Sequence, residues 1–399
     1  MEKIASKIKK FNEPLLKKQV SLKYKQMNKN LYSFFRGTCH LFYEELSQEK
    51  KIPFSPAIWI CGDLHMENFG SYKGDNRLVY FDLNDFDESI LAPASWELIR
   101  FVTSIFIAFD SLNIEEKKAE NMANLFLKIY SQTLAKGKSF YIEPQTAQGI
   151  VCEFLNAVSK RKQKELLAKR TIKKGKKRLL ITDDKRLPLN KEEKKELFKH
   201  MNDWIINNSG RPYNYEVVDV VFRIAGLGSL GLKRYLFLLK STNLKEKYLF
   251  VDMKQSRVSS LAPFIKIQQP NWKTESERII TVQERMQNIP PFLLSTTSFA
   301  EESFVLQELQ PIKDNINFNL IKDEYRNMYQ VINDMAMLTA SAQLRSAGRQ
   351  NAANADELVL FGQNDNWQPQ IMKYAVKYSQ HIKKQYTSFQ KDYKLKKLA

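Results

Sequence analysis

The sequence predicts an α+β fold with two lobes, one built mainly from helices and the other around an antiparallel sheet. Three observations lead to this prediction. Apolar residues recur at helical spacing near both ends of the chain, residues 217–253 contain three segments rich in β-branched and aromatic residues, and glycine or polar turns separate those segments. With 399 residues, the chain is long enough for two or three domains or lobes.

The elements follow from the local pattern, taken in chain order. Residues 1–50 are expected to be helical, because Leu31, Phe34 and Leu41 lie at helical spacing. Strands are expected at 57–61 and 77–83, with a loop between them, and residues 95–158 are predicted to be amphipathic helices. Beyond these we expect a hairpin at 179–187, strands at 217–225, 233–240 and 247–253, a helix at 276–287, a strand at 304–309, and mostly helix from 325 onward.

The charge of the chain is strongly positive, at +19, which is enough to attract polyanions. Much of it lies in a stretch that begins at Lys160 and ends at Arg178, with eleven basic residues and one acidic residue. A solvated helix end and loop is the commoner meaning of such a run, and a polyanion contact is the alternative.

Two classes of protein are disfavoured by composition. The first twenty residues contain lysines throughout and no uninterrupted apolar stretch, so we expect no secretory signal, no transmembrane segment and a cytoplasmic location. The three cysteines and four histidines lack the spacing of a zinc site, a disulfide framework or a histidine-rich metal centre.

An acidic loop, GDLHMENFG, lies between the first two predicted strands and is followed by YFDLNDFDES. Phosphoryl transfer requires a carboxylate that orients the acceptor hydroxyl and oxygen ligands that hold Mg²⁺ against the phosphates. The D-x-x-x-x-N spacing supplies both from one loop, with Asp63 as the catalytic carboxylate and Asn68 as a metal ligand. Aspartate and asparagine also cap ordinary turns, so the spacing alone is weak evidence.

A glycine loop occurs in RIAGLGSLGLKRYLFLL, where Gly226, Gly228 and Gly231 form G-x-G-x-x-G, with Ser229 inside the motif. A dinucleotide-binding motif would be followed by a helix, whereas a strand is predicted here. A glycine loop between two strands is the arrangement that covers ATP phosphates in kinases.

The next strand ends in Lys254, at the position from which a kinase-type lysine reaches the phosphates. The helix predicted at 276–287 offers Glu277 and Glu284, and one of them is expected to orient this lysine, with a slight preference for Glu277. A solvated lysine at a strand end is the alternative meaning of Lys254.

These segments resemble the bacterial family DUF2252, which is related to the protein kinase-like and aminoglycoside phosphotransferase-like superfamily. The resemblance is carried by SFFRG, GDLHMENFG, FDLNDFDE, AGLGSLG, the strand that ends at Lys254 and TASAQLRSA, and it extends over most of the chain. It implies a bilobal kinase-like fold with circularly permuted order, because the acidic loop precedes the glycine loop. The expected regions are a catalytic region at 1–210, a nucleotide-binding region at 211–318 and a helical return at 319–399.

The resemblance also implies residue roles. Asp63 corresponds to the catalytic aspartate and Asn68 to the metal-binding asparagine. Both Asp82 and Asp85 are candidates for the metal aspartate, and Asp85 is favoured because it precedes PASWELIR, which is similar to the segment after the metal motif in aminoglycoside phosphotransferases. This chain has Gln343 where the family usually has histidine, which puts activity in doubt if that histidine is catalytic.

We therefore expect an ATP- and Mg²⁺-dependent, kinase-like phosphotransferase that acts on an unidentified small-molecule or protein acceptor. Nucleotidyl (AMP) transfer in the same cleft is a close variant, because ATP bound in reverse would present its α-phosphate to the same ligands. A catalytically silent nucleotide-binding regulator and a polyanion-binding module are the alternatives from other classes.

Overall fold

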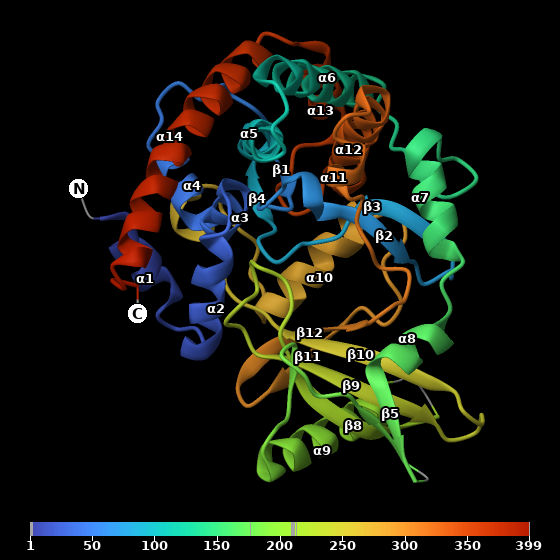
Figure 1. Cartoon of the computed structure of the whole chain (residues 1–399). Helices are drawn as coiled ribbons and strands as arrows, with labels where there is room; N and C mark the ends of the chain where they lie inside the picture. Colours follow the sequence, from blue (N-terminus) through green and yellow to red (C-terminus); the bar gives the residue numbers. More distant parts are fainter. Residues whose placement is uncertain (1–2, 176, 209–211, 213, 399) are drawn as a thin grey trace.

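A helical lobe and a sheet lobe lie one above the other in the computed structural model, which describes residues 3–175, 177–208, 212 and 214–398 (Figure 1). The N-terminal helices and the last helix lie side by side at one edge of the helical lobe. None of the described helices combines the length and the apolar composition needed to cross a membrane.

The helical lobe consists of α1 (Ile4–Asn12), α2 (Lys17–Met27), α3 (Leu31–Gly37), α4 (Cys39–Ser47), β1 (Ala57–Ile60), the short 3-10 helix η1 (Met66–Asn68), β2 (Phe69–Lys73), β3 (Val79–Leu83), β4 (Ile90–Pro93), α5 (Ala94–Ser111), α6 (Glu116–Ala135), α7 (Gly149–Ser159), α11 (Phe318–Ile321), α12 (Tyr325–Ser346), α13 (Ala355–Gln363) and α14 (Gln368–Lys394). Helix α5 is mostly apolar and buried from Ala94 to Phe109, because α3, α6 and α14 pack around it, and it also buries Glu97 and Arg100. It forms the centre of the larger hydrophobic core.

The sheet lobe consists of α8 (Gln163–Arg170), β5 (Thr171–Lys174), β6 (Lys177–Leu180), β7 (Arg186–Leu187), α9 (Lys191–Asn207), β8 (Tyr215–Arg223), β9 (Arg234–Ser241), β10 (Tyr248–Gln255), β11 (Ser295–Phe299) and β12 (Glu302–Glu308). Between the lobes lie the short η2 (Ala262–Phe264) and α10 (Glu275–Met286), which contacts α12 on one side and β11 and β12 on the other.

The six-stranded sheet has the antiparallel order β11-β12-β10-β9-β8-β7. Alternate residues of β10 face opposite sides, as the pleat of a strand requires. Val251 and Met253 pack under α9 in a separate core with Leu197 and Met201, whereas Lys254 points to the other face. We call the face that carries Lys254 the cleft face of the sheet.

Most predicted elements are confirmed, including the three strands between residues 215 and 255, the helix at 275–286 and the strand before the return to the helical lobe. The predicted hairpin at 179–187 is present only at its turn, where Asp183 and Arg186 form one antiparallel bridge. Strand β6 pairs with β5, and β7 pairs with β8 at the edge of the large sheet. By pairing with β8 at the edge of the large sheet, β7 forms backbone hydrogen bonds that an isolated short hairpin would hold only weakly.

Three further differences concern short strands and region boundaries. Strand β2 occupies part of the predicted loop between 61 and 77, and β11 was not predicted. Helix α9 and strand β7 precede residue 211, where the predicted nucleotide-binding region begins, but they pack with the sheet lobe.

Candidate functional site

Asp63 lies in the loop between β1 and η1, directly after Gly62, whose φ of +86° is accessible to glycine. A side chain at residue 62 would also collide with the backbone carbonyl of Glu88. One carboxylate oxygen of Asp63, Oδ1, accepts hydrogen bonds from Arg100 Nη2 at 2.7 Å and from Arg100 Nε at 3.0 Å. The side chain of Arg100 is fully buried and that of Asp63 is 19% exposed, so the ion pair connects the core to the site.

Arg100 is a functional residue that sequence reasoning missed. Its guanidinium lies 3.5 Å from the ring centroid of Phe35 and donates to the carbonyl oxygen of Phe35 at 3.0 Å. An arginine inside an otherwise apolar, buried helix requires a counter-charge, because an unpaired buried charge is very costly. The need for a counter-charge could have indicated from the sequence that Arg100 pairs with an acidic residue. In the structure that residue is Asp63.

Asn68 is buried at the end of η1, and its amide nitrogen donates to the backbone carbonyl of Asp63. Asn68 is only 4% exposed and does not line the cavity around Asp63. The loop is further fixed where the backbone N–H of Glu67 donates to Nδ1 of His65 at 3.2 Å. The D-x-x-x-x-N spacing thus corresponds to one short, internally bonded loop.

A buried polar chain supports this loop from behind. Oε1 of Glu97 accepts hydrogen bonds from the backbone N–H groups of Cys61 at 2.6 Å and Gly62 at 3.3 Å, immediately before Asp63. Gln343 donates to the other carboxylate oxygen of Glu97 at 2.9 Å and accepts from the hydroxyl of Tyr130. Gln343, which stands where the family usually has histidine, is therefore linked to the acidic loop through its hydrogen bond to Glu97.

We predict that Glu97→Gln changes how stability depends on pH. Burial raises the pKa of the Glu97 carboxyl from 4.5 to about 7. Because this pKa is higher in the folded state than in the unfolded state, folding takes up a proton, and that stabilisation is complete below 4.5 and lost as the pH rises through about 7. Glutamine keeps one of the two acceptor oxygens and does not ionise, so the stability of the variant relative to wild type should rise across this window, by on the order of 3 kcal/mol.

Unfolding midpoints of both proteins at about pH 5 and about pH 8 test this prediction. Burial raises the pKa of Asp82 and of Asp334 to about 6, so these groups give the wild type a pH dependence of the same sign. Only the difference between variant and wild type reports on Glu97. A difference that stays constant between the two pH values would contradict the assignment.

The three acidic residues after β3 occupy different environments. Asp82 is buried and pairs with Arg345, with 3.3 Å between Oδ2 and Nη2. Asp85 is exposed, and its Oδ1 accepts from the backbone N–H of Asp87 at 3.3 Å. Asp85 and Asp87 share a cavity with Asp63, and Asp82 does not line it. The geometry therefore favours Asp85 over Asp82 as a metal ligand.

Lys254 reaches across from the sheet lobe and forms an ion pair with Asp87. Burial alone would lower the pKa of Lys254, but the charges of Asp87 and Asp85 outweigh burial and raise it, so the ammonium group stays charged. This pair brings the end of β10 to the acidic segment of the helical lobe.

The helix carboxylates expected to orient Lys254 are located elsewhere. Glu277 lies in the first turn of α10, where its side chain accepts from the backbone N–H of Lys273 at 2.6 Å, and Glu284 is exposed. Helix α10 acts through Arg278 instead, whose Nη2 donates to the carbonyl oxygens of Asp87 at 3.0 Å and Arg257 at 2.9 Å. The partner of Lys254 is thus Asp87, an assignment that sequence reasoning missed.

The glycine loop between β8 and β9 closes one side of the same cavity. Gly226 and Gly231 have φ values of +75° and +104°, which favour glycine. A Cβ atom at Gly228 would meet nothing within 4 Å, so the backbone there borders open space. Ser229 is turned back into the loop, where its hydroxyl donates to the carbonyl oxygen of Ala225 at 2.7 Å.

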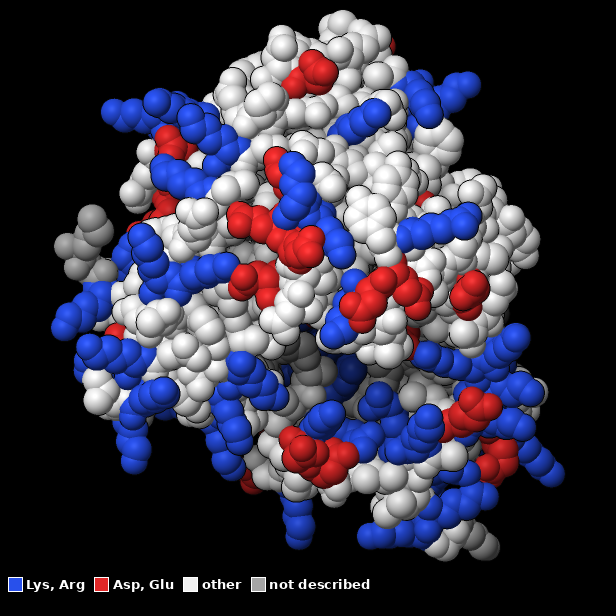
Figure 2. All heavy atoms as spheres, turned by 45° about the horizontal axis from the view of Figure 1, so that its top comes forward, with Lys and Arg blue, Asp and Glu red and all other residues white. Residues whose placement is uncertain are grey.

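We call the shared space the site cavity, and it measures about 100 Å³. Its walls come from α1–α4, the acidic loop, the glycine loop and the end of β10, and they include Asp63, Asp85, Asp87, Gly228 and Arg257. Figure 2 shows a hollow between the two lobes, with basic side chains inside it and along its rim. The cavity is smaller than the pockets of about 300–1,000 Å³ that usually bind small molecules.

The donor atoms at the cavity fit Mg²⁺. Among the described residues, no group of three or more histidine, cysteine, aspartate or glutamate side chains is arranged to hold a metal ion alone. Magnesium in phosphate-transfer sites is bound by one or two carboxylates together with phosphate oxygens. Asp85 lines the site cavity and can supply a carboxylate, whereas the carboxylate of Asp82 is engaged by Arg345. Asn68 is buried in the acidic loop and does not line the cavity in this structure, so its role as a metal ligand stays a prediction.

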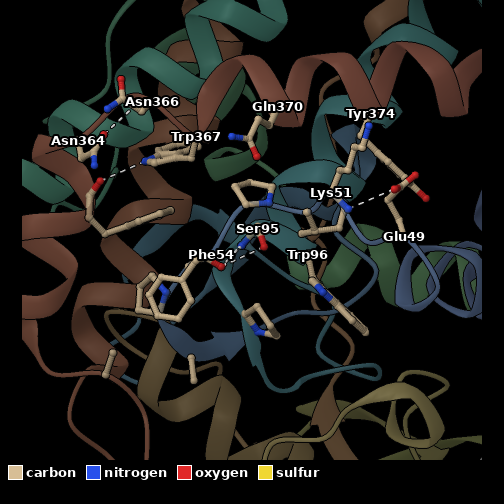
Figure 3. Close-up of a pocket in the computed structure, with 18 of the residues that line it drawn as sticks. Glu49, Lys51, Phe54, Ser95, Trp96, Asn364, Asn366, Trp367, Gln370 and Tyr374 are labelled. Atoms are coloured by element: carbon tan, nitrogen blue, oxygen red, sulfur yellow. Dashed lines mark hydrogen bonds between the residues drawn. The ribbon is translucent and has the colours of Figure 1, made fainter.

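A larger pocket, of about 1730 Å³, lies on the helical lobe between the β1 and β4 region and helices α13 and α14 (Figure 3). Aromatic side chains line it, among them Phe54, Trp96, Trp367 and Tyr374. None of the predicted site residues contributes to it, so size alone does not locate the site predicted from sequence.

The basic stretch at 160–178 forms α8 and the β5–β6 hairpin, apart from Lys176, which lies outside the described residues. Arg161 pairs with Asp314 at 2.6 Å, and Arg178 lies 3.5 Å from Glu246. Polyanion binding by this stretch remains a prediction.

Fold and site together define a mixed α/β protein of two lobes, in which a glycine loop and a lysine from an antiparallel sheet meet an acidic loop of the helical lobe. The chain belongs to the family DUF2252, described as an uncharacterized protein conserved in bacteria, because the family model matches residues 15–392. Comparison with curated proteins and with solved structures gave no match.

Proposed function

We propose that this chain is an ATP- and Mg²⁺-dependent, kinase-like transferase that moves a phosphorus-containing group from ATP to a hydroxyl of a small-molecule or protein acceptor. The observation that carries the proposal is the ion pair of Lys254 with Asp87, because Asp87 lines the site cavity together with Asp63, Asp85 and the glycine loop. These are the groups that phosphoryl-transfer enzymes use to bind phosphate, metal and acceptor.

The order of elements in the sheet lobe supports a kinase-like fold. A glycine loop joins β8 to β9, a lysine ends β10, and helix α10 follows, which is the kinase sequence of glycine loop, lysine strand and helix. The acidic loop comes earlier in the chain, so the fold would be circularly permuted. The replacement of the helix glutamate by Asp87 as the lysine's partner is a difference from kinases.

The chain's own residues have separate tasks in this proposal. Asp63 accepts the hydrogen bond of the acceptor hydroxyl, and Arg100 holds its carboxylate in one orientation. Lys254 binds phosphate oxygen, and the backbone around Gly228 allows close approach of an anion. Asn68 and Asp85 would hold Mg²⁺, which when bound neutralises phosphate charge.

The departure at Gln343 gives little support to a catalytically silent regulator. Gln343 is fully buried and contacts Glu97 and Tyr130, away from the residues that line the site cavity. Its hydrogen bond to Glu97 does the positioning that a histidine donor would do. Glutamine in place of histidine at residue 343 therefore does not alter the contacts of Asp63, Asp85 or Lys254 directly.

Calorimetric titration of the purified protein with ATP tests the proposal, with Mg²⁺ present or removed by a chelator. We expect saturable binding that weakens strongly without Mg²⁺ and in Lys254→Met. Absence of ATP binding in both conditions would contradict the proposed function.

A further inference from the structure

The aromatic pocket of the helical lobe, which measures about 1730 Å³, has no task in the proposed transfer. The segment between α4 and β1, the start of α5 and the helices α13 and α14 enclose it. In Figure 3, Trp367 and Tyr374 lie along one side of the pocket, and Phe54 and Trp96 lie along the other. Pockets that bind small molecules usually measure about 300–1,000 Å³, so this pocket has room for a longer ligand.

Two large apolar side chains that line the aromatic pocket are exposed to solvent. Phe54 is 93% exposed, and Leu360 of α13 is 65% exposed. The buried rings of Trp96 and Trp367 line the same pocket. Apolar side chains that are grouped in this way on a surface mark a binding site, whereas apolar residues exposed singly do not.

The wall that carries Phe54 is a segment between α4 and β1 without helix or strand. In the described part of the chain, the backbone N–H groups of Ile52, Phe54 and Ser55 form no hydrogen bond. Pro53 and Pro56 favour extended backbone at the residues that precede them. An extended segment with unpaired N–H groups can pair with a second extended chain, as in β-strand addition. The wall therefore favours a polypeptide ligand over a lipid or a small molecule.

The charged side chains that line the aromatic pocket leave an excess of positive charge. They are four lysines and two glutamates. Glu49 lies 3.2 Å from Nζ of Lys377, and Glu357 accepts a hydrogen bond from the backbone N–H of Asn354 at 2.7 Å. Three lysines of the pocket form no ion pair with any described residue, namely Lys50, Lys51 and Lys373. Charge complementarity therefore favours a ligand that carries carboxylates.

We propose that the aromatic pocket binds an extended segment of a partner protein, in which apolar side chains are interspersed with aspartate or glutamate. The apolar side chains pack against Phe54, Trp96 and Trp367, and the carboxylates pair with the unpaired lysines. The backbone of the partner segment pairs with the N–H groups beside Phe54. This inference does not depend on the proposed function, because no residue lines both the aromatic pocket and the site cavity.

Selection of a phage-displayed library of random peptides on the purified full chain tests this proposal. We expect enriched peptides that combine aromatic or leucine residues with aspartate or glutamate. The affinity of a labelled synthetic peptide from the enriched set is then measured by fluorescence anisotropy. Phe54→Ser should weaken binding by roughly tenfold or more, as substitution of a hot-spot residue does. Lys373→Glu should also weaken binding and make the remaining affinity less sensitive to salt.

Ile206→Ser and Lys322→Glu are the matched controls. Ile206 is 78% exposed on α9 of the sheet lobe, and Lys322 is an exposed lysine that does not line the aromatic pocket. Both controls should bind the peptide as the wild type does. Thermal unfolding of all four variants should match the wild type, because each replaced side chain is exposed.

Three results would overturn the proposal: no enriched family of peptides, enriched peptides without acidic residues, or equal affinity of Phe54→Ser and wild type. Two further measurements identify other occupants. Binding to anionic phospholipid vesicles that Phe54→Ser abolishes would assign the pocket to a lipid surface. Self-association in sedimentation that Phe54→Ser abolishes would assign it to a second copy of this chain. Either result, without enriched peptides, would also overturn the proposal.

Discussion

Asp63→Asn is expected to lower the rate of Mg²⁺-dependent ATP consumption by roughly 10²–10⁴-fold, the usual contribution of a positioned acid–base group. Asparagine keeps an oxygen for Arg100 but accepts no proton from a hydroxyl. ATP binding should persist, because Lys254, Asp85 and the glycine loop are unchanged. Steady-state consumption and calorimetric titration of the same preparation measure the two effects separately.

The choice of asparagine matters because Asp63 is also the counter-ion of a buried arginine. Both alanine and asparagine remove the counter-charge of Arg100, but asparagine keeps an acceptor oxygen for its N–H groups. Breaking a fully buried ion pair costs about 3–5 kcal/mol, and the loss should be smaller here because Asp63 is 19% exposed. The matched control is Asp110→Asn, which removes a surface carboxylate that pairs with Lys383 at 2.6 Å. If Asp63→Asn and this control consume ATP equally fast, Asp63 is not the catalytic carboxylate.

Lys254→Met is expected to have the second large effect, because the lysine is both a phosphate ligand and the ion-pair partner of Asp87. Removing one electrostatic stabiliser from such a site lowers the rate by roughly 10²–10³-fold. Stability should fall as well, by less than the roughly 3–5 kcal/mol of a fully buried pair, since Asp87 remains 32% exposed. ATP titration, ATP consumption and thermal unfolding measure these effects.

Lys240→Met serves as the control for this variant. Lys240 lies on β9 of the same sheet, opposite Tyr248 and far along the strand from Arg234. The Lys240→Met variant should consume ATP at the rate of the wild type. Asp87→Asn should reproduce part of the defect of Lys254→Met, because it weakens the same pair from the other side. A Lys254→Met protein with normal affinity and normal rate would show that Lys254 is only a structural residue.

Much of the fold was predictable because local signals and tertiary structure agree. The strands around the glycine loop contain β-branched residues and are separated by clear turns. Thr274 caps the N-terminus of α10, because its side chain accepts a hydrogen bond from the backbone N–H of Glu277 at 3.2 Å. The β5–β6 pairing was not predictable in the same way. Its strands are short and rich in lysine, and they are stabilised by tertiary contacts that include the hydrogen bond from the backbone N–H of Leu180 to Asp219 and the packing of Leu180 on the sheet.

The candidate site was predictable where one segment carries several of its residues, and not where partners come from separate segments. The spacing of Asp63 and Asn68 reflects a single loop, and Gly226 and Gly231 adopt the backbone conformations that glycine permits. The pairs Asp63–Arg100 and Lys254–Asp87 join residues that are 37 and 167 positions apart in the chain. The sequence contains many other carboxylates, and spacing alone does not show which of them pairs with a given arginine or lysine. Whether Lys254 pairs with Glu277 or with Asp87 depends on how the two lobes pack against each other, and the spacing of residues in the sequence does not predict that packing.

The proposed function requires the acidic loop and the glycine loop to bind the same nucleotide. A crystal structure with Mg²⁺ and a non-hydrolysable ATP analogue measures this directly. We expect phosphate oxygens within hydrogen-bond distance of Lys254 and a metal ion bound to Asp85 and Asn68. An analogue bound outside the cleft, for example in the aromatic pocket of the helical lobe, with Lys254 still paired to Asp87 and no phosphate near either loop, would contradict it.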